Sequence, residues 1–155
     1  MGRPTTGRVR DRPIALNEKV SAQMSRMPRV RSRPEMLLRR ELHSRGMRFR
    51  VNLATLPGRP DIAFTRARIA VFVDGCFWHM CPAHATMPKN NSEWWREKLL
   101  KNVERDRRKD AELNAMGWLV IHAWEHEDPQ LVADEVQRRW LAQREDPSTG
   151  GALPR

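Results

Sequence analysis

The stretch DIAFTRARIAVFVDG, residues 61–75, decides the fold. It holds two short apolar runs, DIAF and RIAVFV, which have the composition of buried strands and are separated by the polar turn TRAR. The preceding run MRFRV, residues 47–51, alternates between apolar and basic residues as an edge strand does. Together the three runs predict a β-meander.

A helix is predicted before the meander, over about residues 33–45. In the segment SRPEMLLRRELHSRG, Ser32 suits the N-cap and Pro34 suits the first turn. Glu35 lies three residues after Ser32, which is the spacing of a capping box, and it also shares one helix face with Leu38. Its carboxylate is therefore either a capping acid or an inward-facing functional group.

Two more helices and a strand are predicted after the meander. NSEWWREKLLKNVERDRRKDAELNAMG predicts one long charged helix, with Ser92 as its cap and Gly117 at its end. WLVIHAW, residues 118–124, has the composition of a buried strand. DPQLVADEVQRRWLAQ predicts a last amphipathic helix, whose apolar side is formed by Leu131, Val132, Val136 and Trp140.

The predicted order α-β-β-β-α-β-α indicates an α/β fold, with a small mixed sheet flanked by helices on both faces. The 155 residues suffice for one ordinary domain. We expect residues 24–142 to form this domain. Residues 1–23, which are rich in Pro, Gly and Arg, are expected to be a disordered basic extension, and residues 143–155 a disordered tail.

The charge balance indicates a polyanionic partner. Lys and Arg number 29 against 19 Asp and Glu, which gives a formal net charge of +10, and nucleic acid fits this excess best. Much of the excess lies in residues 1–40, where Arg26, Arg29 and Arg31 are candidates for phosphate or minor-groove contacts. Since no apolar run could cross a membrane and no signal-peptide core is present, we expect a cytoplasmic protein without a membrane partner.

The segment GCFWHMCPAHATMPKN, residues 75–90, indicates a metal clamp. Both cysteines of the chain lie here beside histidines, and in a reducing compartment such a pair is more often a metal site than a disulfide. Two Cys and two His make a complete tetrahedral set for structural Zn²⁺, and the candidates are Cys76, Cys81, His84 and His126. A clamp would order this long irregular loop. The alternative is two buried cysteines with incidental histidines.

A second group of residues indicates a site for a hard cation. The hairpin return between LPGRPDIAF and RIAVFVDG places Asp61 at the mouth of one strand and Asp74 at the end of the next, together with a backbone carbonyl. Such oxygen ligands suit Mg²⁺, which can activate water for phosphodiester hydrolysis. The alternative is that Asp61, which follows Pro60, is only a turn residue.

The loop also carries candidates for proton transfer and for DNA contact. His79 lies between the cysteines and is either a general acid or base beside the metal site or an exposed loop residue. Phe77, Trp78 and Trp95 are aromatic side chains near a basic surface that can insert between base steps, or else pack in the core. Lys98, near the start of the long helix, is a further candidate for DNA binding.

Several of these motifs occur in an order and spacing that resemble the very short patch repair (Vsr) DNA mismatch endonucleases, of the PD-(D/E)xK nuclease superfamily. The motifs are LPGRPDIAF, VFVDGCFWHMCPAH, EWWREKLLKNVERDRRKDAEL and GWLVIHAWEHE, and the resemblance covers about residues 24–140. It implies a restriction-endonuclease-like fold and a Mg²⁺-dependent enzyme. Such an enzyme nicks one DNA strand on the 5′ side of the thymine in a T:G mismatch left by deamination of 5-methylcytosine.

The resemblance also implies partners and residue roles. Duplex DNA with a T:G mismatch is the implied partner, mismatch-repair proteins are candidate partners, and we expect a monomer. The metal-binding aspartate of the family corresponds to Asp61 and its metal-binding carbonyl to Val73. The catalytic histidine corresponds to His79 and the glutamate of the N-terminal helix to Glu35. The family's zinc ligands correspond to Cys76, Cys81, His84 and His126, and its intercalating aromatic residues to Phe77, Trp78 and Trp95.

The chain departs from the family pattern at two points. Asp74 stands where a second active-site histidine is often found, which would give the metal a further carboxylate and remove one proton-transfer group. The superfamily lysine is absent, because Val73, Asp74 and Gly75 occupy that motif, so its role would pass to His79 or to the metal alone. Two other functions stay open: a restriction-like endonuclease of the same fold without T:G specificity, and a zinc-stabilised DNA-binding protein without catalysis.

Overall fold

The computed structural model describes residues 32–84 and 87–145. Arg26, Arg29 and Arg31, predicted to contact DNA, lie outside the described residues, as do the predicted extension 1–23 and residues 146–155. The described helices and strands, in chain order, are α2 (Arg33–Ser44), β1 (Arg50–Val51), β2 (Ile62–Phe64), β3 (Ile69–Asp74), α3 (Ser92–Ala115), β4 (Leu119–Trp124) and α4 (Pro129–Glu145). This order confirms the predicted α-β-β-β-α-β-α succession.

The four strands form one mixed sheet in the order β1-β2-β3-β4. β1 pairs with β2 and β2 pairs with β3 in antiparallel fashion, as a meander predicts. β4 pairs with β3 in parallel, from Ile69 opposite Leu119 to Asp74 opposite Trp124. This parallel pairing needs a long crossover, which contains α3. The carboxyl ends of β3 and β4 therefore lie together, and the residues that follow each strand meet at that edge.

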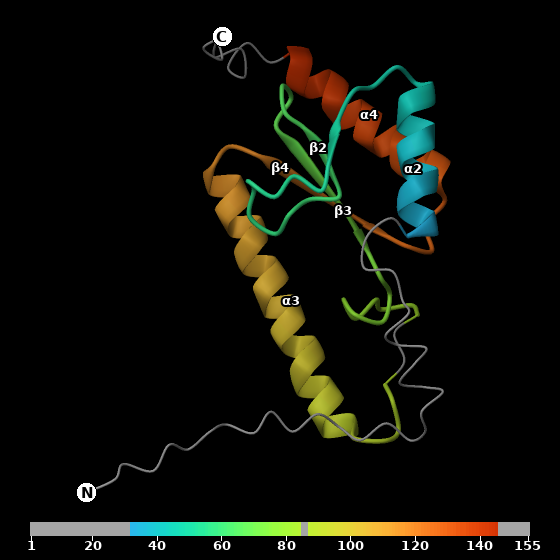
Figure 1. The fold of residues 1–155 in the computed structure, drawn as a ribbon, viewed down its shortest axis with the longest axis vertical. Coiled ribbons are helices and arrows are strands. Elements are labelled where there is room, and N and C mark those ends of the chain that lie inside the picture. Colours follow the sequence, from blue (N-terminus) through green and yellow to red (C-terminus); the bar gives the residue numbers. More distant parts are fainter. Residues whose placement is uncertain (1–31, 85–86, 146–155) are drawn as a thin grey trace, which may run out of the picture.

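Each face of the sheet is covered by different helices. Successive strand residues point to opposite faces, so Ile62, Phe64 and Val71 pack with α2 and α4, while Ala63 and Ala70 pack on the side of α3. Figure 1 shows α2 and α4 side by side over one face and the long α3 on the other. Buried side chains of the first face include Leu38, Leu42, Ile69, Val132, Ala133 and Val136. The predicted sheet with helices on both faces is confirmed.

The predicted capping box at the start of α2 is wrong. Ser32 lies at the N-cap position but makes no side-chain hydrogen bond to the helix. Glu35 is only 3 % exposed, so its carboxylate faces the inside of the molecule. The burial of Glu35 between the helices and the sheet has overridden the local capping pattern. Of the two alternatives for Glu35, the inward-facing carboxylate holds. The helix itself ends at Ser44, within a residue of the predicted boundary.

The later helices differ from the predictions at their ends and on one face. α3 includes Ser92 as its first residue, and Asn91 stands at the N-cap position in the left-handed region, with φ 55°. Leu131 is 67 % exposed, so it is not part of the apolar side of α4. α4 continues through Glu145, just past the end of the predicted helix segment at residue 143. Within residues 32–84 and 87–145, no helix has the length and apolar character needed to cross a membrane.

Candidate active site and metal cluster

Asp61 lies just before β2 and is tied to β3 by a backbone hydrogen bond. The backbone N–H of Val73 donates to its carboxylate at 2.7 Å. The pKa of Asp61 rises to about 6, chiefly because burial disfavours the charged form. The nearby carboxylates of Glu35 and Asp74 also raise this pKa, while the Val73 N–H and Arg39 oppose the rise. Three acids from separate elements are therefore close enough to repel one another.

Glu35 reaches this group of acids from α2 and is accompanied by a buried cation. Arg39, one turn further along the helix, forms an ion pair with the Glu35 carboxylate, and both side chains are at most 9 % exposed. Among the described residues, the Nε of Arg39 is a buried atom without a hydrogen-bond partner. The sequence reasoning did not identify Arg39, since its place in RPEMLLRR looks like one more basic residue of a charged helix.

His79 is oriented by an aspartate of α3. Its Nδ1 lies 2.6 Å from Asp106 Oδ2, and its Nε2 lies 3.9 Å from Asp74 Oδ1. The His79 and Asp106 side chains are each 28 % exposed, so the imidazole is neither a core group nor a freely solvated loop residue. A carboxylate on one ring nitrogen fixes the ring and leaves the other nitrogen able to exchange a proton. The geometry thus favours the acid–base alternative for His79.

His122, in the middle of β4, is a site residue that the sequence reasoning missed. Its Nδ1 lies 2.6 Å from Asp74 Oδ2, and its Nε2 lies 2.8 Å from Asp110 Oδ2. Burial disfavours its charged form, but the hydrogen bond and charge of Asp74, with the charge of Asp110, raise its pKa to about 9. In the sequence, the only clue to this residue was a single histidine within the apolar run WLVIHAW. In the structure, the His122 ring lies on the face of the sheet toward α3 and stacks on Phe72.

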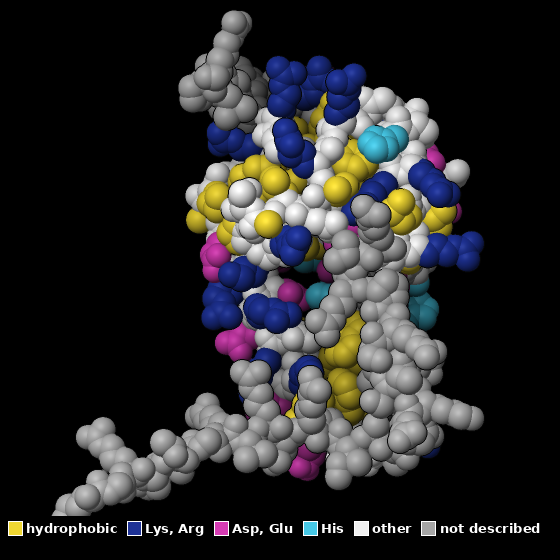
Figure 2. Space-filling view, viewed as in Figure 1, with side chains coloured by type: hydrophobic (Ala, Val, Ile, Leu, Met, Phe, Trp, Pro, Cys, Tyr) yellow, Lys and Arg dark blue, Asp and Glu magenta, His cyan; other side chains and the backbone are white. Residues whose placement is uncertain are grey.

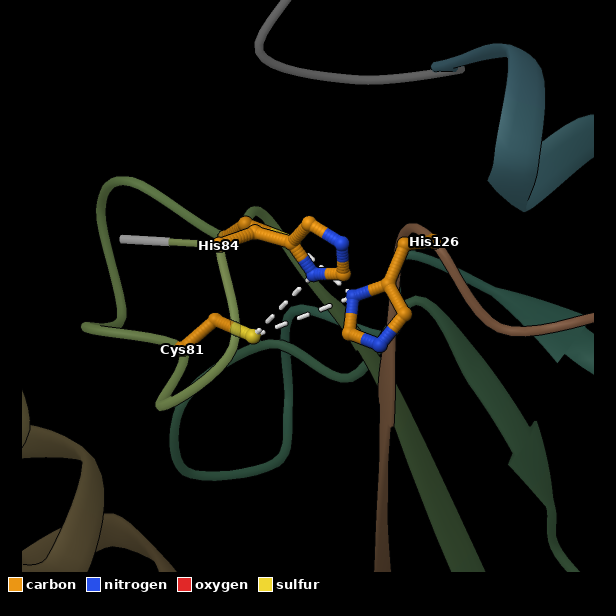
Figure 3. Close-up of side chains that lie close together, drawn as sticks. Cys81, His84 and His126 are labelled. Atoms are coloured by element: carbon orange, nitrogen blue, oxygen red, sulfur yellow. Dashed lines mark hydrogen bonds between the residues drawn. The ribbon is translucent and has the colours of Figure 1, made fainter. Parts of the chain in front are cut away.

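The four predicted zinc ligands come together. The ligand atoms of Cys76, Cys81, His84 and His126 all lie within 4.8 Å of one another. Cys76 Sγ is 3.1 Å from His126 Nδ1, and Cys81 Sγ is 3.9 Å from His84 Nδ1 and 3.8 Å from His126 Nδ1. Figure 3 shows the two rings and the Cys81 sulfur converging, with His126 arriving from the segment after β4.

These separations fit a tetrahedral ion. In a tetrahedral zinc site, a Zn–S bond of about 2.3 Å and a Zn–N bond of about 2.0 Å place the sulfur and nitrogen atoms about 3.5 Å apart. Burial and the neighbouring Cys81 thiol raise the pKa of Cys76 to about 11, so a cation must replace the proton for this thiol to act as a ligand. The four residues therefore form a group that could hold a metal ion.

The loop between the cysteines is also held by the backbone. Cys81 N–H donates to the carbonyl of Cys76 at 2.9 Å, and Cys76 N–H donates to the carboxylate of Glu125 at 3.1 Å. Glu125 follows β4 and its own N–H donates to the carbonyl of Asp74 at 2.9 Å. The parallel pairing therefore continues one residue past the end of β4, and together with the Glu125 carboxylate it fixes where the loop starts.

The aromatic residues of the loop pack against those at the start of α3. Phe77 contacts Trp78 and Trp95 with ring centroids 5.0 Å and 5.5 Å apart, and Trp94 contacts Trp95 edge-on at 4.9 Å. All four rings are half-buried, so they form a surface cluster instead of a core. Lys98 Nζ lies 4.9 Å from the Trp94 centroid and 5.9 Å from that of Trp95, where it adds a positive charge to the aromatic surface.

Basic side chains accompany this cluster along α3. Figure 2 shows Lys and Arg side chains on the side of the molecule where Figure 1 places this helix, with Asp and Glu between them. The exposed basic residues of α3 include Arg96, Lys98, Lys101, Arg105, Arg107 and Arg108. The face toward the sheet carries Asp106 and Asp110, whose carboxylates hold the two imidazoles. One face of α3 thus supports the site, and the rest of its surface is suited to a polyanion.

Metal-assisted cleavage of a phosphodiester uses carboxylates that can hold a cation and a group that moves a proton. Both are present at the carboxyl edge of this sheet, beside a basic and aromatic surface, so fold and site together define a DNA endonuclease. The sequence profile of the family described as DNA mismatch endonuclease Vsr matches residues 14–84. The chain belongs to the Vsr DNA mismatch endonuclease family.

Individual relatives support this assignment over most of the chain. The type II nicking enzyme V.NaeI of Lentzea aerocolonigenes is 42 % identical over 123 residues, 76 % of this chain and 74 % of the relative. The type II nicking enzyme V.XorIIP of Xanthomonas oryzae pv. oryzae is 44 % identical over 117 residues, 73 % and 86 % of the two chains. The DNA mismatch endonuclease Vsr of Escherichia coli is 45 % identical over 85 residues, 54 % of each chain. Membership implies the restriction-endonuclease-like fold that the family resemblance predicted.

Proposed function

We propose that the chain is a Mg²⁺-dependent endonuclease that nicks one strand of duplex DNA on the 5′ side of the T in a T:G mismatch. This reaction would start very short patch repair of deaminated 5-methylcytosine. The observation that carries the proposal is Asp61: a buried carboxylate whose pKa is raised to about 6 beside two other acids. Such a group of acids is costly unless a cation or a proton offsets the charge.

Asp61 and the carbonyl of Val73 would hold Mg²⁺, with Glu35 and Asp74 adding negative charge nearby. The donor set fits, since all are hard oxygen ligands of the kind that Mg²⁺ prefers. When bound, Mg²⁺ activates water and stabilises the charge that develops on the phosphate. The chain's own part is to keep Asp61 in place through the Val73 N–H and to keep Glu35 directed inward through Arg39.

His79 would move the proton. Asp106 holds its Nδ1, so Nε2 is the nitrogen that can exchange a proton with the attacking water or the leaving oxygen. Cys76 and Cys81, on either side of His79 in the sequence, with His84 and His126, would bind Zn²⁺ and keep this loop ordered. The zinc would have a structural role, because four protein ligands leave no open position for substrate.

Mismatch recognition would come from the aromatic cluster. Phe77 and Trp78 project from the same loop as His79, and Trp95 supports them from α3. Insertion of such side chains opens the base stack, and a mispaired step costs less to unstack than a paired one. Lys98 and the neighbouring basic residues of α3 would bind phosphates. The same loop would then bring the inserting rings of Phe77 and Trp78 and the proton-transfer group of His79 to the DNA together.

The test is a strand-nicking assay on duplexes that differ at one position, T:G, T:A or C:G, with and without Mg²⁺. We expect Mg²⁺-dependent nicking of the T:G duplex on the 5′ side of the thymine and little cleavage of the others. Asp61→Asn should abolish nicking while DNA binding is retained. Arg138→Gln, at an exposed position of α4, serves as a control that should nick normally. Equal cutting of all three duplexes would refute mismatch specificity.

A second function is favoured by the names of several relatives, which are called type II nicking enzymes. It is an endonuclease of the same fold that nicks a particular sequence without regard to a T:G mismatch. It predicts equal nicking of matched and mismatched duplexes in the same sequence context. A zinc-stabilised DNA-binding protein without catalysis predicts binding without nicking, and an Asp61→Asn variant that behaves like the parent.

A further inference from the structure

Two aspartates of α3 hold two imidazoles, one on each side of Asp74. Asp106 and Asp110 are four residues apart and so lie on one face of the helix, toward the sheet. Asp106 contacts His79 Nδ1 at 2.6 Å, and Asp110 contacts His122 Nε2 at 2.8 Å. Asp74 lies between the rings, with Oδ1 3.9 Å from His79 Nε2 and Oδ2 2.6 Å from His122 Nδ1. Carboxylates and imidazoles thus alternate across the site.

The position of His122 is set by strand pairing and by a stacked ring. It lies on β4 directly opposite Phe72 of β3, and the two rings stack with centroids 5.1 Å apart. Both ring nitrogens face carboxylates, which accept hydrogen bonds when ionised, so both nitrogens act as donors. The ring therefore has fixed contacts on its face and at both nitrogens. A residue held in this way can fix the group it contacts.

Asp74 depends on this contact for its orientation. It is 7 % exposed, and its carboxylate is the one acid of the site that touches both imidazoles. One oxygen is occupied by His122, which directs the other toward His79. If the His122 contact were lost, the carboxylate could rotate about its Cα–Cβ and Cβ–Cγ bonds, and its place next to His79 and Asp61 would no longer be defined.

We propose that His122, itself held by Asp110, is a positioning residue that fixes the Asp74 carboxylate beside His79 and Asp61. This inference rests on the proposed nuclease function and deepens it, because it assigns a role to an imidazole from the neighbouring strand. His122 acts through Asp74 and does not touch the DNA or the metal. The inference requires the Nδ1 contact to matter for the reaction more than the Nε2 contact.

Two substitutions separate these contacts. In His122→Asn the side-chain amide occupies the place of Nδ1 and can still donate to Asp74. In His122→Gln the amide reaches the place of Nε2 and can still donate to Asp110. Both variants are neutral and lose the stacking ring, and they differ by one methylene group, which decides which aspartate the amide can reach. His43→Gln, on α2 and outside the site, is the control for loss of an exposed imidazole.

The readouts are single-turnover nicking across a Mg²⁺ titration, DNA affinity in Ca²⁺, melting temperature, and ¹⁵N signals of the His79 ring. We expect His122→Gln to nick about 10–100-fold more slowly, in the range of losses seen when residues that orient metal ligands are changed. It should also need more Mg²⁺ for half-saturation and shift the His79 signals. His122→Asn should retain most activity, with His79 signals near those of the parent. DNA affinity and melting temperature should change equally in both variants.

Equal losses in both variants that follow their melting temperatures would overturn the proposal, because His122 would then be only a structural residue. Parental activity in His122→Gln would also overturn it. A parent protein that nicks no duplex would instead contradict the proposed function. In that case the His79 signals still decide the positioning role, since they report the orientation of Asp74 without any reaction.

Discussion

At the scale of single residues, the site is governed by acids that share a confined space. Asp61, Glu35 and Asp74 come from three elements, and burial together with mutual repulsion raises the pKa of Asp61 to about 6. Arg39 and the His122 imidazole supply compensating charge in the structure, and a bound cation would supply more. The carboxylate proposed to bind metal is thus one that the folded chain holds at a cost in stability.

This cost predicts a pH dependence of stability. Because its pKa is higher in the folded state than in the unfolded chain, Asp61 contributes stability that is present below about pH 4 and is lost as the pH rises through about 6. Asp61→Asn removes this contribution. Without added Mg²⁺, the free energy of unfolding of the parent should fall relative to that of the variant by roughly 2 kcal/mol between pH 4 and pH 7. Urea unfolding at both pH values checks this, and a parent that gains relative to the variant would contradict it.

A second prediction concerns the buried ion pair. Arg39→Met leaves the Glu35 carboxylate buried without this cation, which should destabilise the protein by about 3 kcal/mol. The double variant Glu35→Leu with Arg39→Met should recover most of that loss, because no charge is then left behind. Urea unfolding at pH 7 measures both differences. If the double variant were as unstable as Arg39→Met, the loss would come from packing and not from an uncompensated charge.

At the scale of elements, the segment that follows β3 depends on contacts made beyond its own sequence. His126 and Glu125 follow β4, yet they approach the cysteine loop because β3 and β4 are parallel neighbours. α3 contacts the same site from the other side through Asp106 and Asp110. The position of the loop is therefore set by the carboxyl ends of β3 and β4 and by one face of α3. The cluster of cysteine sulfur and histidine nitrogen atoms lies where these elements meet.

A third prediction follows for the zinc cluster. Cys81→Ser removes a good donor and should lower the zinc content of the purified protein toward zero, with a weakened aromatic cluster. Cys81→His keeps a zinc donor and should retain one zinc per chain. Metal analysis measures the content, and tryptophan fluorescence reports the packing of Trp78 against Trp95. If Cys81→Ser kept its zinc, the four ligand atoms would not form the binding site.

At the scale of the whole molecule, charge is distributed unevenly over the surface. On α3 the exposed Lys98 lies over the aromatic cluster, whereas Arg138 and Arg139 of α4 are paired with Glu135. An unpaired cation facing DNA releases counterions on binding, and a cation already paired with an acid does so less. DNA affinity should therefore depend on salt through the residues of α3.

The fourth prediction is that Lys98→Gln weakens DNA binding and lowers the slope of log K against log salt concentration by about 1. Arg138→Gln, which removes an equal charge from α4, should leave the slope unchanged because Arg138 is paired with Glu135. Binding to a labelled duplex in Ca²⁺ at several salt concentrations measures both slopes. Equal changes in the two variants would show that net charge alone controls binding.

Much of the fold could be predicted from local patterns. The apolar runs at 62–64, 69–74 and 119–124 became strands. The four Cys and His residues predicted as zinc ligands from their residue types have their ligand atoms within 4.8 Å of one another. Helix ends were predicted less well. Ser32 fits a capping box by spacing, but burial of Glu35 against the sheet outweighed a cap of about 1 kcal/mol.

The sequence by itself therefore determined the order of helices and strands, the family, and the residue types that could bind metal, because these depend on composition and short spacing. Only the tertiary structure decided the roles of His122, Arg39 and Asp110. The contact between His122 and Asp74 joins residues 48 positions apart and exists because β4 pairs in parallel with β3. The pairing of distant strands leaves no local pattern in the sequence. The sequence around His122 therefore indicates only a strand, and the contacts of its imidazole appear only in the folded structure.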